Sequence, residues 1–171
     1  MNKITFILGG AKSGKSAYAL KLAKNHKKVA FIATCEPLDR EMRKRITLHK
    51  NRRPSHWKTF EEPQDLTSLL KEISLKFDAI IIDCLTLMIS NLMLKGFREI
   101  AIKSKINKML GILKKIKAQS IIVSNEVGLG LVPENKLARN FRDIAGRINQ
   151  LVAEKSDEVF FLVSGIPWRI K

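Results

Sequence analysis

Residues 9–16 of the chain read Gly9-Gly10-Ala11-Lys12-Ser13-Gly14-Lys15-Ser16. This stretch fits G-x-x-x-x-G-K-[ST], the pattern of a loop that binds nucleotide phosphates. A short apolar run at 4–8 precedes it, and a helix-compatible run at 17–23 follows it. Because the phosphate loop stands between a strand and a helix, this context favours it over a glycine-rich turn with an incidental lysine.

The residue types in this loop match the chemistry of phosphate binding. Glycines allow backbone N–H groups to turn inward around an anion, and the N-terminus of the following helix adds partial positive charge. Lys15 is expected to reach the terminal phosphates of a nucleoside triphosphate, and the Ser16 hydroxyl is expected to bind Mg²⁺. All eight residues are therefore candidate nucleotide-binding residues, and Lys15 is also a candidate catalytic residue.

The rest of the chain predicts a single α/β domain covering residues 1–171. Near-continuous apolar runs, typical of strands buried on both faces, occur at 4–8, 29–33, 79–83, 120–124 and 159–164. Apolar residues recur with helical spacing at 102–116 and again at 137–154. Strands that alternate with helices indicate a P-loop fold with a mostly parallel, RecA-like sheet flanked by helices. The least regular segment, at about 35–65, is expected to be functional or disordered.

Polar residues follow two of the predicted strands. Asp83 ends one of them, where an acid beside a phosphate loop commonly helps to hold Mg²⁺; the alternative is that it caps a helix. Asn125 and Glu126 follow another. Because the carboxyl ends of parallel strands line the ligand crevice of open α/β sheets, both are well placed for a ligand, although simple turn formation explains them equally well.

His49 stands in a segment dense in cations, which runs Arg45-Ile46-Thr47-Leu48-His49-Lys50-Asn51-Arg52-Arg53. Neighbouring positive charges lower the pKa of a histidine, which keeps its imidazole neutral at pH 7. A neutral imidazole can attack phosphorus, and nearby Arg and Lys side chains would stabilise the phosphate charge. The alternative from local sequence is a charge-rich exposed helix. His26 is expected at a solvated helix end, and His56, beside Trp57, is expected to have a packing role.

Composition sets further bounds. The net charge of +16, from 32 basic and 16 acidic residues, is compatible with nucleic-acid binding or with anionic small substrates. The basic residues do not form one block, and aromatic residues make up only 6% of the chain, so the stacking surface of a single-strand binder is missing. No apolar run reaches the roughly 18 residues of a membrane span, and none resembles a signal peptide. Cys35 and Cys84 are expected to be reduced thiols in a cytoplasmic protein.

A series of motifs then continues through the whole chain in order. After the phosphate loop come Phe31-Ile32-Ala33-Thr34, Asp39-Arg40-Glu41-Met42, Arg45-Ile46 with His49, Arg53-Pro54, Trp57-Lys58-Thr59, Glu61-Glu62-Pro63, Asp83-Cys84-Leu85-Thr86-Leu87, Ser90-Asn91-Leu92, Asn125-Glu126-Val127-Gly128, Val132-Pro133, Phe141-Arg142-Asp143, Gly146, Asn149-Gln150 and Ser164-Gly165-Ile166-Pro167. Together they resemble the bifunctional adenosylcobinamide kinase and adenosylcobinamide-phosphate guanylyltransferase family. The phosphate loop is generic, whereas the His49 segment and the block from 125 to 150 are specific.

The resemblance implies two reactions in cobalamin biosynthesis. ATP or GTP phosphorylates the hydroxyl on the aminopropanol arm of adenosylcobinamide, and GTP then donates GMP to that phosphate through a guanylyl-histidine. By motif position that histidine is His49. The nucleotide contacts implied by position are Thr34, Cys35 through its backbone, Glu36, Lys50, Asn51, Arg52, Arg53, Glu61 and Glu62, with Asp83 at the metal. The family also suggests a homo-oligomer, in the form of a trimer, although no interface can be read from the sequence.

Two alternatives remain at this level. One is a non-catalytic nucleotide-binding module that acts on nucleic acid, which the net charge of +16 suggests. The other is a simple small-molecule kinase without guanylyl transfer. His49 separates the alternatives, because only a guanylyltransferase of this type needs the histidine.

Overall fold

Parallel strand pairing dominates the structure, a computed structural model that describes residues 3–36, 40, 43, 47, 50 and 53–171. In these residues one seven-stranded sheet has the order β3-β2-β4-β5-β1-β6-β7. Every neighbouring pair is parallel except β6 and β7, which form an antiparallel hairpin. The predicted α/β fold with a mostly parallel sheet is confirmed.

The elements follow one another as strand and helix. The strands are β1 (Ile4–Gly9), β2 (Val29–Ala33), β3 (Lys58–Glu61), β4 (Ala79–Asp83), β5 (Gln119–Val123), β6 (Glu158–Val163) and β7 (Ile166–Arg169). The helices are α1 (Lys15–Ala23), α3 (Leu66–Ile73), α4 (Leu85–Leu94), α5 (Glu99–Leu113) and α6 (Lys136–Lys155).

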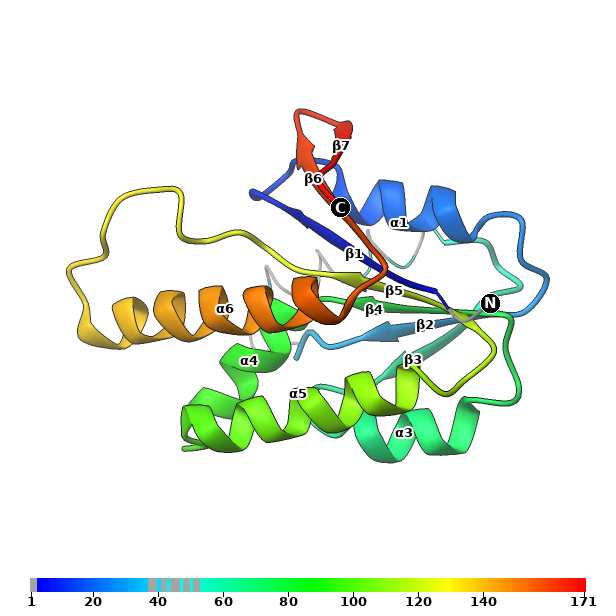
Figure 1. Ribbon diagram of the computed structural model, residues 1–171, viewed down its shortest axis with the longest axis horizontal. Helices are drawn as coiled ribbons and strands as arrows, with labels where there is room; N and C mark the ends of the chain where they lie inside the picture. Colours follow the sequence, from blue (N-terminus) through cyan, green and yellow to red (C-terminus); the bar gives the residue numbers. More distant parts are fainter. Residues whose placement is uncertain (1–2, 37–39, 41–42, 44–46, 48–49, 51–52) are drawn as a thin grey trace.

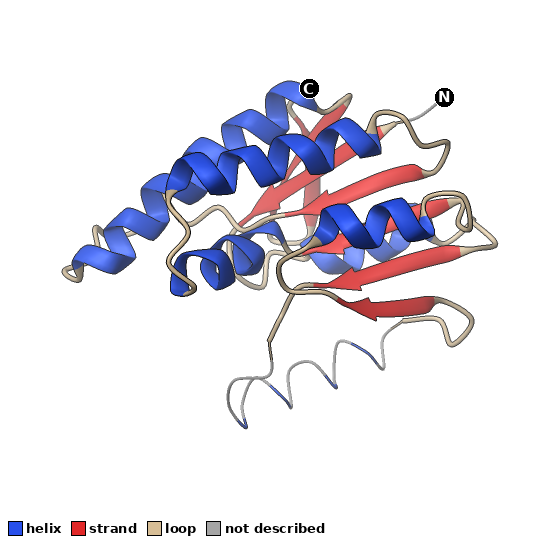
Figure 2. Cartoon of the chain, turned by 90° about the horizontal axis from the view of Figure 1, so that it is seen from below, coloured by secondary structure: helices blue, strands red, loops and turns tan. Residues whose placement is uncertain are grey.

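Helices cover both faces of the sheet. Figure 1 shows α1 on one face and α3, α4, α5 and α6 on the other, and Figure 2 shows this second layer from below. The core divides accordingly: Ile80 and Ile82 of β4 pack toward the layer with α3 to α6, whereas Ile81 packs toward Ala19 of α1. Strands covered on both faces need apolar side chains at every position, which explains the continuous apolar runs in the sequence.

All five predicted strands are present, within a residue at either end. The structure adds two edge strands, β3 and β7, which the sequence does not reveal; β3 lies inside the segment at 35–65. It also adds α3 and α4, whereas α5 and α6 correspond to the two predicted helical patterns. The parallel arrangement brings the carboxyl ends of β1 to β6 to one edge of the sheet. The phosphate loop, Thr34, Glu61 and Asp83 lie along that edge.

Candidate nucleotide-binding and active site

The loop between β1 and α1 has the backbone conformation of an anion-binding turn. Ser13 N donates to Gly10 O at 3.3 Å, and Tyr18 N donates to Gly14 O at 2.9 Å to begin α1. Gly14, the residue before the helix, has φ 96°. This left-handed conformation strains residues with a side chain, so a glycine is required at this position.

The loop is closely backed by the β6–β7 hairpin. A Cβ atom on Gly9 would lie 2.6 Å from Leu162 O, and one on Gly14 would lie 3.1 Å from Gly165 Cα. In addition, Gly165 N donates to Ser13 O at 2.9 Å. The first and last glycines of the motif therefore serve packing as well as phosphate access, because the hairpin leaves no room for a methyl group at Gly9.

Lys15 is folded over the loop. Its ammonium Nζ donates to Gly10 O at 2.5 Å and lies 3.4 Å from Ser13 Oγ. Its surface is only 7% exposed. The side chain thus places a positive charge at the concave side of the turn, where a phosphate would accept hydrogen bonds from it.

Asp83 ends β4, two strands away from β1 with β5 between them. It is half-buried, and the next residue, Cys84, is buried. Burial, followed by the neighbouring charge of Asp83, raises the pKa of the Cys84 thiol to about 12. Cys84 is therefore a neutral side chain at physiological pH and no nucleophile, which leaves Asp83 as the ionisable group at this strand end.

The Mg²⁺ ion expected with a nucleotide fits this arrangement. The described residues contain no group of three or more His, Cys, Asp or Glu side chains that could hold a metal by themselves. Mg²⁺ usually binds through one or two protein oxygens together with substrate phosphates and water. Ser16 at the start of α1 and Asp83 at the end of β4 provide such a sparse ligand set.

Arg53 packs against strands β2 and β3. Its guanidinium carbon lies 3.6 Å from the ring centroid of Phe31, and its Nη1 donates to Thr59 Oγ1 at 3.2 Å. Burial lowers the pKa of Arg53, and the charges of Asp83 and Glu61 partly offset that effect. The guanidinium nevertheless stays charged, since arginine has so high a pKa, and it places a fixed cation against β2 and β3, where the charges of Asp83 and Glu61 act on it.

The other predicted contacts on β2 and β3 have partners within the protein. Thr34 Oγ1 donates to Cys84 O at 2.6 Å and accepts from Cys84 N at 2.8 Å, so this hydroxyl joins β2 to the start of α4. Glu36 accepts from Gln64 at 3.1 Å. Glu62 accepts from the amides of Gln64 and Asp65, which shapes the turn before α3. Glu61 is the exposed member of this group and faces solvent at the end of β3.

Strand order separates these residues into two regions. Because neighbouring strands lie about 4.8 Å apart, β3 is about 19 Å from β1 along the edge. One region contains the phosphate loop and Glu126, the other contains Thr34, Glu36, Arg53, Glu61 and Glu62, and Asp83 at the end of β4 lies between them. Lys50 is exposed, whereas His49, Asn51 and Arg52 lie outside the described residues.

A buried hydrogen-bond network lies beneath the carboxyl edge of the sheet, between α4, β5 and α6. Ser124 Oγ donates to Asn149 Oδ1 at 2.8 Å and lies 2.9 Å from Thr86 Oγ1. Thr86 Oγ1 accepts from Asn125 N at 2.6 Å, and Asn149 Nδ2 donates to Asn125 O at 3.2 Å. The network joins α4, β5 and α6 and holds Asn125 through both of its main-chain groups. The sequence hint of this network is that Thr86, Ser124 and Asn149 are polar residues among apolar neighbours.

The two described histidines are away from this edge. His26 lies just after the end of α1, where its N–H donates to Ala23 O at 3.0 Å. Its half-buried ring bonds Gln119 Oε1 through Nε2 at 2.8 Å, beside the start of β5. His56 lies edge-on to Trp57, with 6.5 Å between ring centroids, and Trp57 is buried. His56 itself is exposed, so its packing role stays a prediction.

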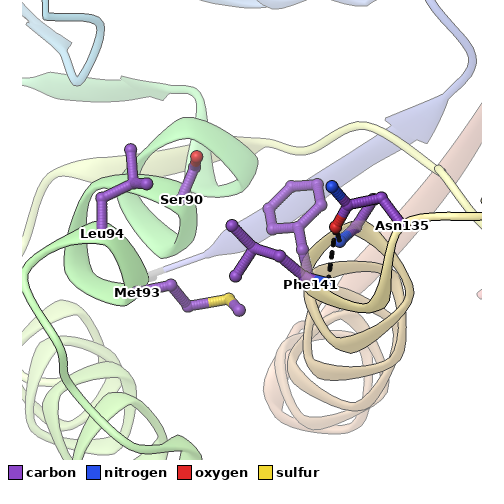
Figure 3. Close-up of a pocket in the computed structure, with 7 residues that line it drawn as sticks. Ser90, Met93, Leu94, Asn135 and Phe141 are labelled. Atoms are coloured by element: carbon purple, nitrogen blue, oxygen red, sulfur yellow. Dashed lines mark hydrogen bonds between the residues drawn. The ribbon is translucent and has the colours of Figure 1, made fainter.

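A shallow groove of about 280 Å³ lies between α4 and the start of α6 (Figure 3). It is referred to below as the α4–α6 groove, and its lining residues are Ser90, Met93, Leu94, Asn135, Leu137, Ala138 and Phe141. The Asn135 side chain caps α6 by accepting from Leu137 N and Ala138 N. The groove is mainly apolar, unlike the edge with the phosphate loop.

A phosphate loop between β1 and α1, with an acid at the end of β4 in a mostly parallel sheet, defines a P-loop nucleotide-binding protein. Comparison with protein families gives a match over residues 5–170 to the family described as cobinamide kinase / cobinamide phosphate guanyltransferase. The chain belongs to this family, and it is therefore a bifunctional transferase with a kinase and a guanylyltransferase activity.

Similar proteins from three bacteria agree with this assignment. The chain is 42% identical to the bifunctional adenosylcobalamin biosynthesis protein CobU of Salmonella typhimurium, over 96% of this chain and 98% of that protein. It is 39% identical to the protein of the same name from Escherichia coli, with the same coverage. It is 40% identical to the bifunctional protein CobP of Pseudomonas aeruginosa, over 96% of this chain and 95% of the relative. Among the described residues, no helix is both long and apolar enough to cross a membrane.

Proposed function

We propose that the chain phosphorylates adenosylcobinamide with ATP or GTP and then transfers GMP from GTP to adenosylcobinamide phosphate. The product is adenosyl-GDP-cobinamide, a precursor in cobalamin biosynthesis. The observation that supports this most strongly is the intact phosphate loop at the carboxyl edge of the sheet in a chain of this family. The corrinoid, the nucleotides and Mg²⁺ are the small-molecule partners of the chain in these reactions.

In the kinase step the acceptor hydroxyl attacks the γ-phosphorus of the nucleoside triphosphate. The bond from the γ-phosphorus to the bridging oxygen breaks, and the nucleoside diphosphate leaves. Lys15 and the backbone N–H groups of the loop would stabilise the charge on the phosphate oxygens. Ser16 and Asp83 would hold Mg²⁺, which supplies positive charge near the leaving group when it is bound.

In the transferase step the proposed nucleophile is His49. A neutral imidazole nitrogen attacks the α-phosphorus of GTP, and pyrophosphate leaves. A phosphate oxygen of the substrate then attacks the resulting phosphoramidate and releases the histidine. The support is the cation-rich sequence around His49 and its position in the family motif. Lys50, Asn51, Arg52 and Arg53 are proposed to contact the nucleotide in this step.

The proposal treats the edge as one extended site. The phosphate loop lies at one end, and Arg53 with Glu61 and Glu62 lies about 19 Å along the sheet. Asp83 lies between the two regions, and its charge acts on Arg53. An edge of this length has room for a nucleotide and a second substrate, which the transfer of a group between them requires.

Association between copies of the chain is also proposed. Large apolar side chains are exposed on β7 and before α6, including Ile166 and Trp168 at 70% and 66% and Leu131 at 95%. Exposed apolar surface of this kind favours association into a homo-oligomer. The family resemblance suggests a trimer, and the proposed place of action is the cytoplasm, where nucleoside triphosphates are available. Light scattering coupled to size-exclusion chromatography measures the mass directly, and a monomer at micromolar concentration contradicts this part.

The test of the two activities uses GTP labelled at the α-phosphate. The wild-type protein should acquire a label that is acid-labile and alkali-stable, as a phosphoramidate is. His49→Asn should abolish the label and guanylyl transfer but keep at least part of the cobinamide phosphorylation, because phosphoryl transfer to a hydroxyl needs no histidine intermediate. His26→Asn and His56→Asn are the controls and should still be labelled. A folded His49→Asn protein that keeps the label would place the nucleophile elsewhere.

A further inference from the structure

Glu126 is held directly beside the phosphate loop. It follows β5, the strand adjacent to β1, whereas Asp83 ends the next strand along the sheet. Its amide donates to the carbonyl oxygen of Gly9, the first residue of the loop, at 3.0 Å. Its main chain is therefore tied to the loop that binds the transferred phosphate.

The carboxylate of Glu126 is oriented as well. Its Oε1 accepts a hydrogen bond from Gly128 N at 2.8 Å. The preceding residue, Asn125, is fixed through its N–H by Thr86 and through its C=O by Asn149. Glu126 is a half-buried residue whose main chain is bonded to the phosphate loop and whose carboxylate accepts one backbone hydrogen bond, which resembles a positioned acid–base group more than a solvated surface residue.

We propose that Glu126 is the catalytic base of the kinase step, an inference that rests on the proposed function. Its carboxylate accepts the proton of the acceptor hydroxyl as the hydroxyl oxygen bonds to the γ-phosphorus and the nucleoside diphosphate leaves. The proton then passes from Glu126 to water. A positioned carboxylate that receives the proton of the attacking hydroxyl is a recurrent requirement of phosphoryl transfer. In the transferase step the attacking phosphate oxygen is already anionic, so that step needs no base.

The rest of the acceptor has a place in the same part of the structure. Two elements, α4 and the connection at 124–135, start beside Asn125, and both end at the α4–α6 groove (Figure 3). Since a helix rises about 1.5 Å per residue, Ser90 and Leu94 lie roughly 6 and 12 Å along α4 from Thr86. The rim of a corrin ring carries methyl groups and carboxamides, which match the apolar lining and the Ser90 hydroxyl. The ring thus lies over the groove, with its aminopropanol arm extending to Glu126.

The principal experiment compares three reactions of Glu126→Gln. This variant keeps an oxygen that can accept from Gly128 N but loses the base. The rate constant for phosphorylation of cobinamide should fall about 100-fold or more. Covalent labelling by GTP, and guanylyl transfer to cobinamide phosphate supplied ready-made, should stay within about threefold of wild type. Glu134→Gln, in the same connection and with the same change in charge, is exposed and should leave all three reactions unchanged.

Three other outcomes would contradict the assignment of Glu126 or the function on which it rests. A Glu126→Gln protein that phosphorylates cobinamide at nearly the wild-type rate overturns the assignment, and so does a parallel loss of all three reactions, which would show a structural role for the connection. A wild-type protein that binds GTP but phosphorylates no cobinamide contradicts the proposed function itself, and the inference about Glu126 fails with it.

The groove is tested separately. Ala138→Trp should fill it and raise the KM for cobinamide at least about tenfold, with little change in the rate at saturation or in covalent labelling by GTP. Asn140→Trp adds the same side chain to an exposed position of the same helix and should leave the KM unchanged. An unchanged KM in Ala138→Trp places the corrin ring elsewhere.

Discussion

Lys15 exposes only 7% of its surface, although a lysine ammonium is strongly hydrated in water. Its desolvation is offset by the two loop oxygens that its ammonium approaches, Gly10 O and Ser13 Oγ. The side chain is therefore already placed at the loop and needs little reorganisation to contact a phosphate. Preorganised charge of this kind contributes to binding and contributes more in the transition state.

Replacement of Lys15 tests this directly. Lys15→Ala removes one charge-assisted phosphate contact, so nucleotide binding should weaken by about 1.5–3 kcal/mol, with a larger loss in both transfer rates. Isothermal titration with GTP and steady-state assays measure the two effects. Lys21→Ala on the exposed face of α1 is the control and should bind normally. Wild-type affinity and rates in folded Lys15→Ala would contradict the role given to the loop.

Asp83 is the second residue with a defined expectation. Asp83→Asn keeps the size of the side chain but removes its charge, so the Mg²⁺ concentration needed for half-maximal activity should rise. Asp78→Asn changes the other end of the same strand, where Asp78 accepts from Lys28 N, and should leave the Mg²⁺ requirement unchanged. Superimposable Mg²⁺ titrations of Asp83→Asn and wild type would show that Asp83 has only a structural role.

At the scale of single residues, local sequence patterns were enough to predict the phosphate loop and Asp83, because both depend on a fixed order of strand, loop and helix. The same patterns could not predict that Arg53 packs against Phe31 or that Gly165 bonds Ser13, since the partners in each contact are distant in sequence. Nor could they show that the Thr34 hydroxyl is occupied by Cys84. The role of His49 stays a prediction, carried by its cation-rich surroundings and its place in the family motif.

At the scale of elements, the buried network decides how α4 and α6 meet β5. Thr86, Ser124 and Asn149 are nearly inaccessible to water, with Asn149 only 4% exposed. Polar groups at such depth stabilise a structure when all of them are bonded, and leave unsatisfied partners when one is removed. The network therefore fixes the connection at 124–135 as well as the packing of the two helices.

Thr86→Val should show this coupling. The variant keeps the shape of the side chain but leaves Asn125 N without its acceptor, so the free energy of unfolding should fall by about 1–3 kcal/mol. Combining it with Asn149→Leu should cost less than the sum of the two single changes, because both disturb one network. Urea unfolding measures all three variants. Thr67→Val on α3 is the control, and additive effects would show that the groups act independently.

Helices and strands were predicted well where their apolar residues form a continuous run or a regular period, and poorly where they form neither. The five central strands are apolar at nearly every position. The edge strands β3 and β7 are short and largely exposed, so their sequences have no such run. In α4, apolar residues occur on almost every side, which removes the helical period that revealed α5. α3 has only 8 residues, too few to establish a period.

At the scale of the whole molecule, stability depends on the two core layers that meet at the sheet. Ile81 of the central strand β4 is completely buried between α1 and its neighbouring strands. By contrast, Arg147 pairs with Glu99 at 2.6 Å on the surface between α6 and α5. Its hydrogen bond lowers the pKa of Glu99. The pair thus contributes at neutral pH, and its contribution is lost as the pH falls through the lowered pKa.

The two kinds of interaction should differ in size. Ile81→Ala leaves a cavity and should reduce the free energy of unfolding by about 2–5 kcal/mol. Glu99→Gln should cost less than about 1 kcal/mol at pH 7, because the pair is exposed to solvent. Thermal and urea unfolding under the same conditions give both values. A surface variant as destabilised as the core variant would contradict this account of stability.

The contact between Gly165 and Ser13 has a consequence for synthesis of the protein on the ribosome. The phosphate loop is translated early, but the hairpin turn that backs it is translated about 150 residues later. Strand β1, which precedes the loop, also has no pairing partner at first, since both of its neighbours, β5 and β6, come from the second half of the chain. A nascent chain therefore cannot complete its nucleotide site, or gain stability from bound GTP, until Gly165 has left the exit tunnel. Chaperones that bind the incompletely paired strands would have to act from the synthesis of the phosphate loop until the synthesis of Gly165.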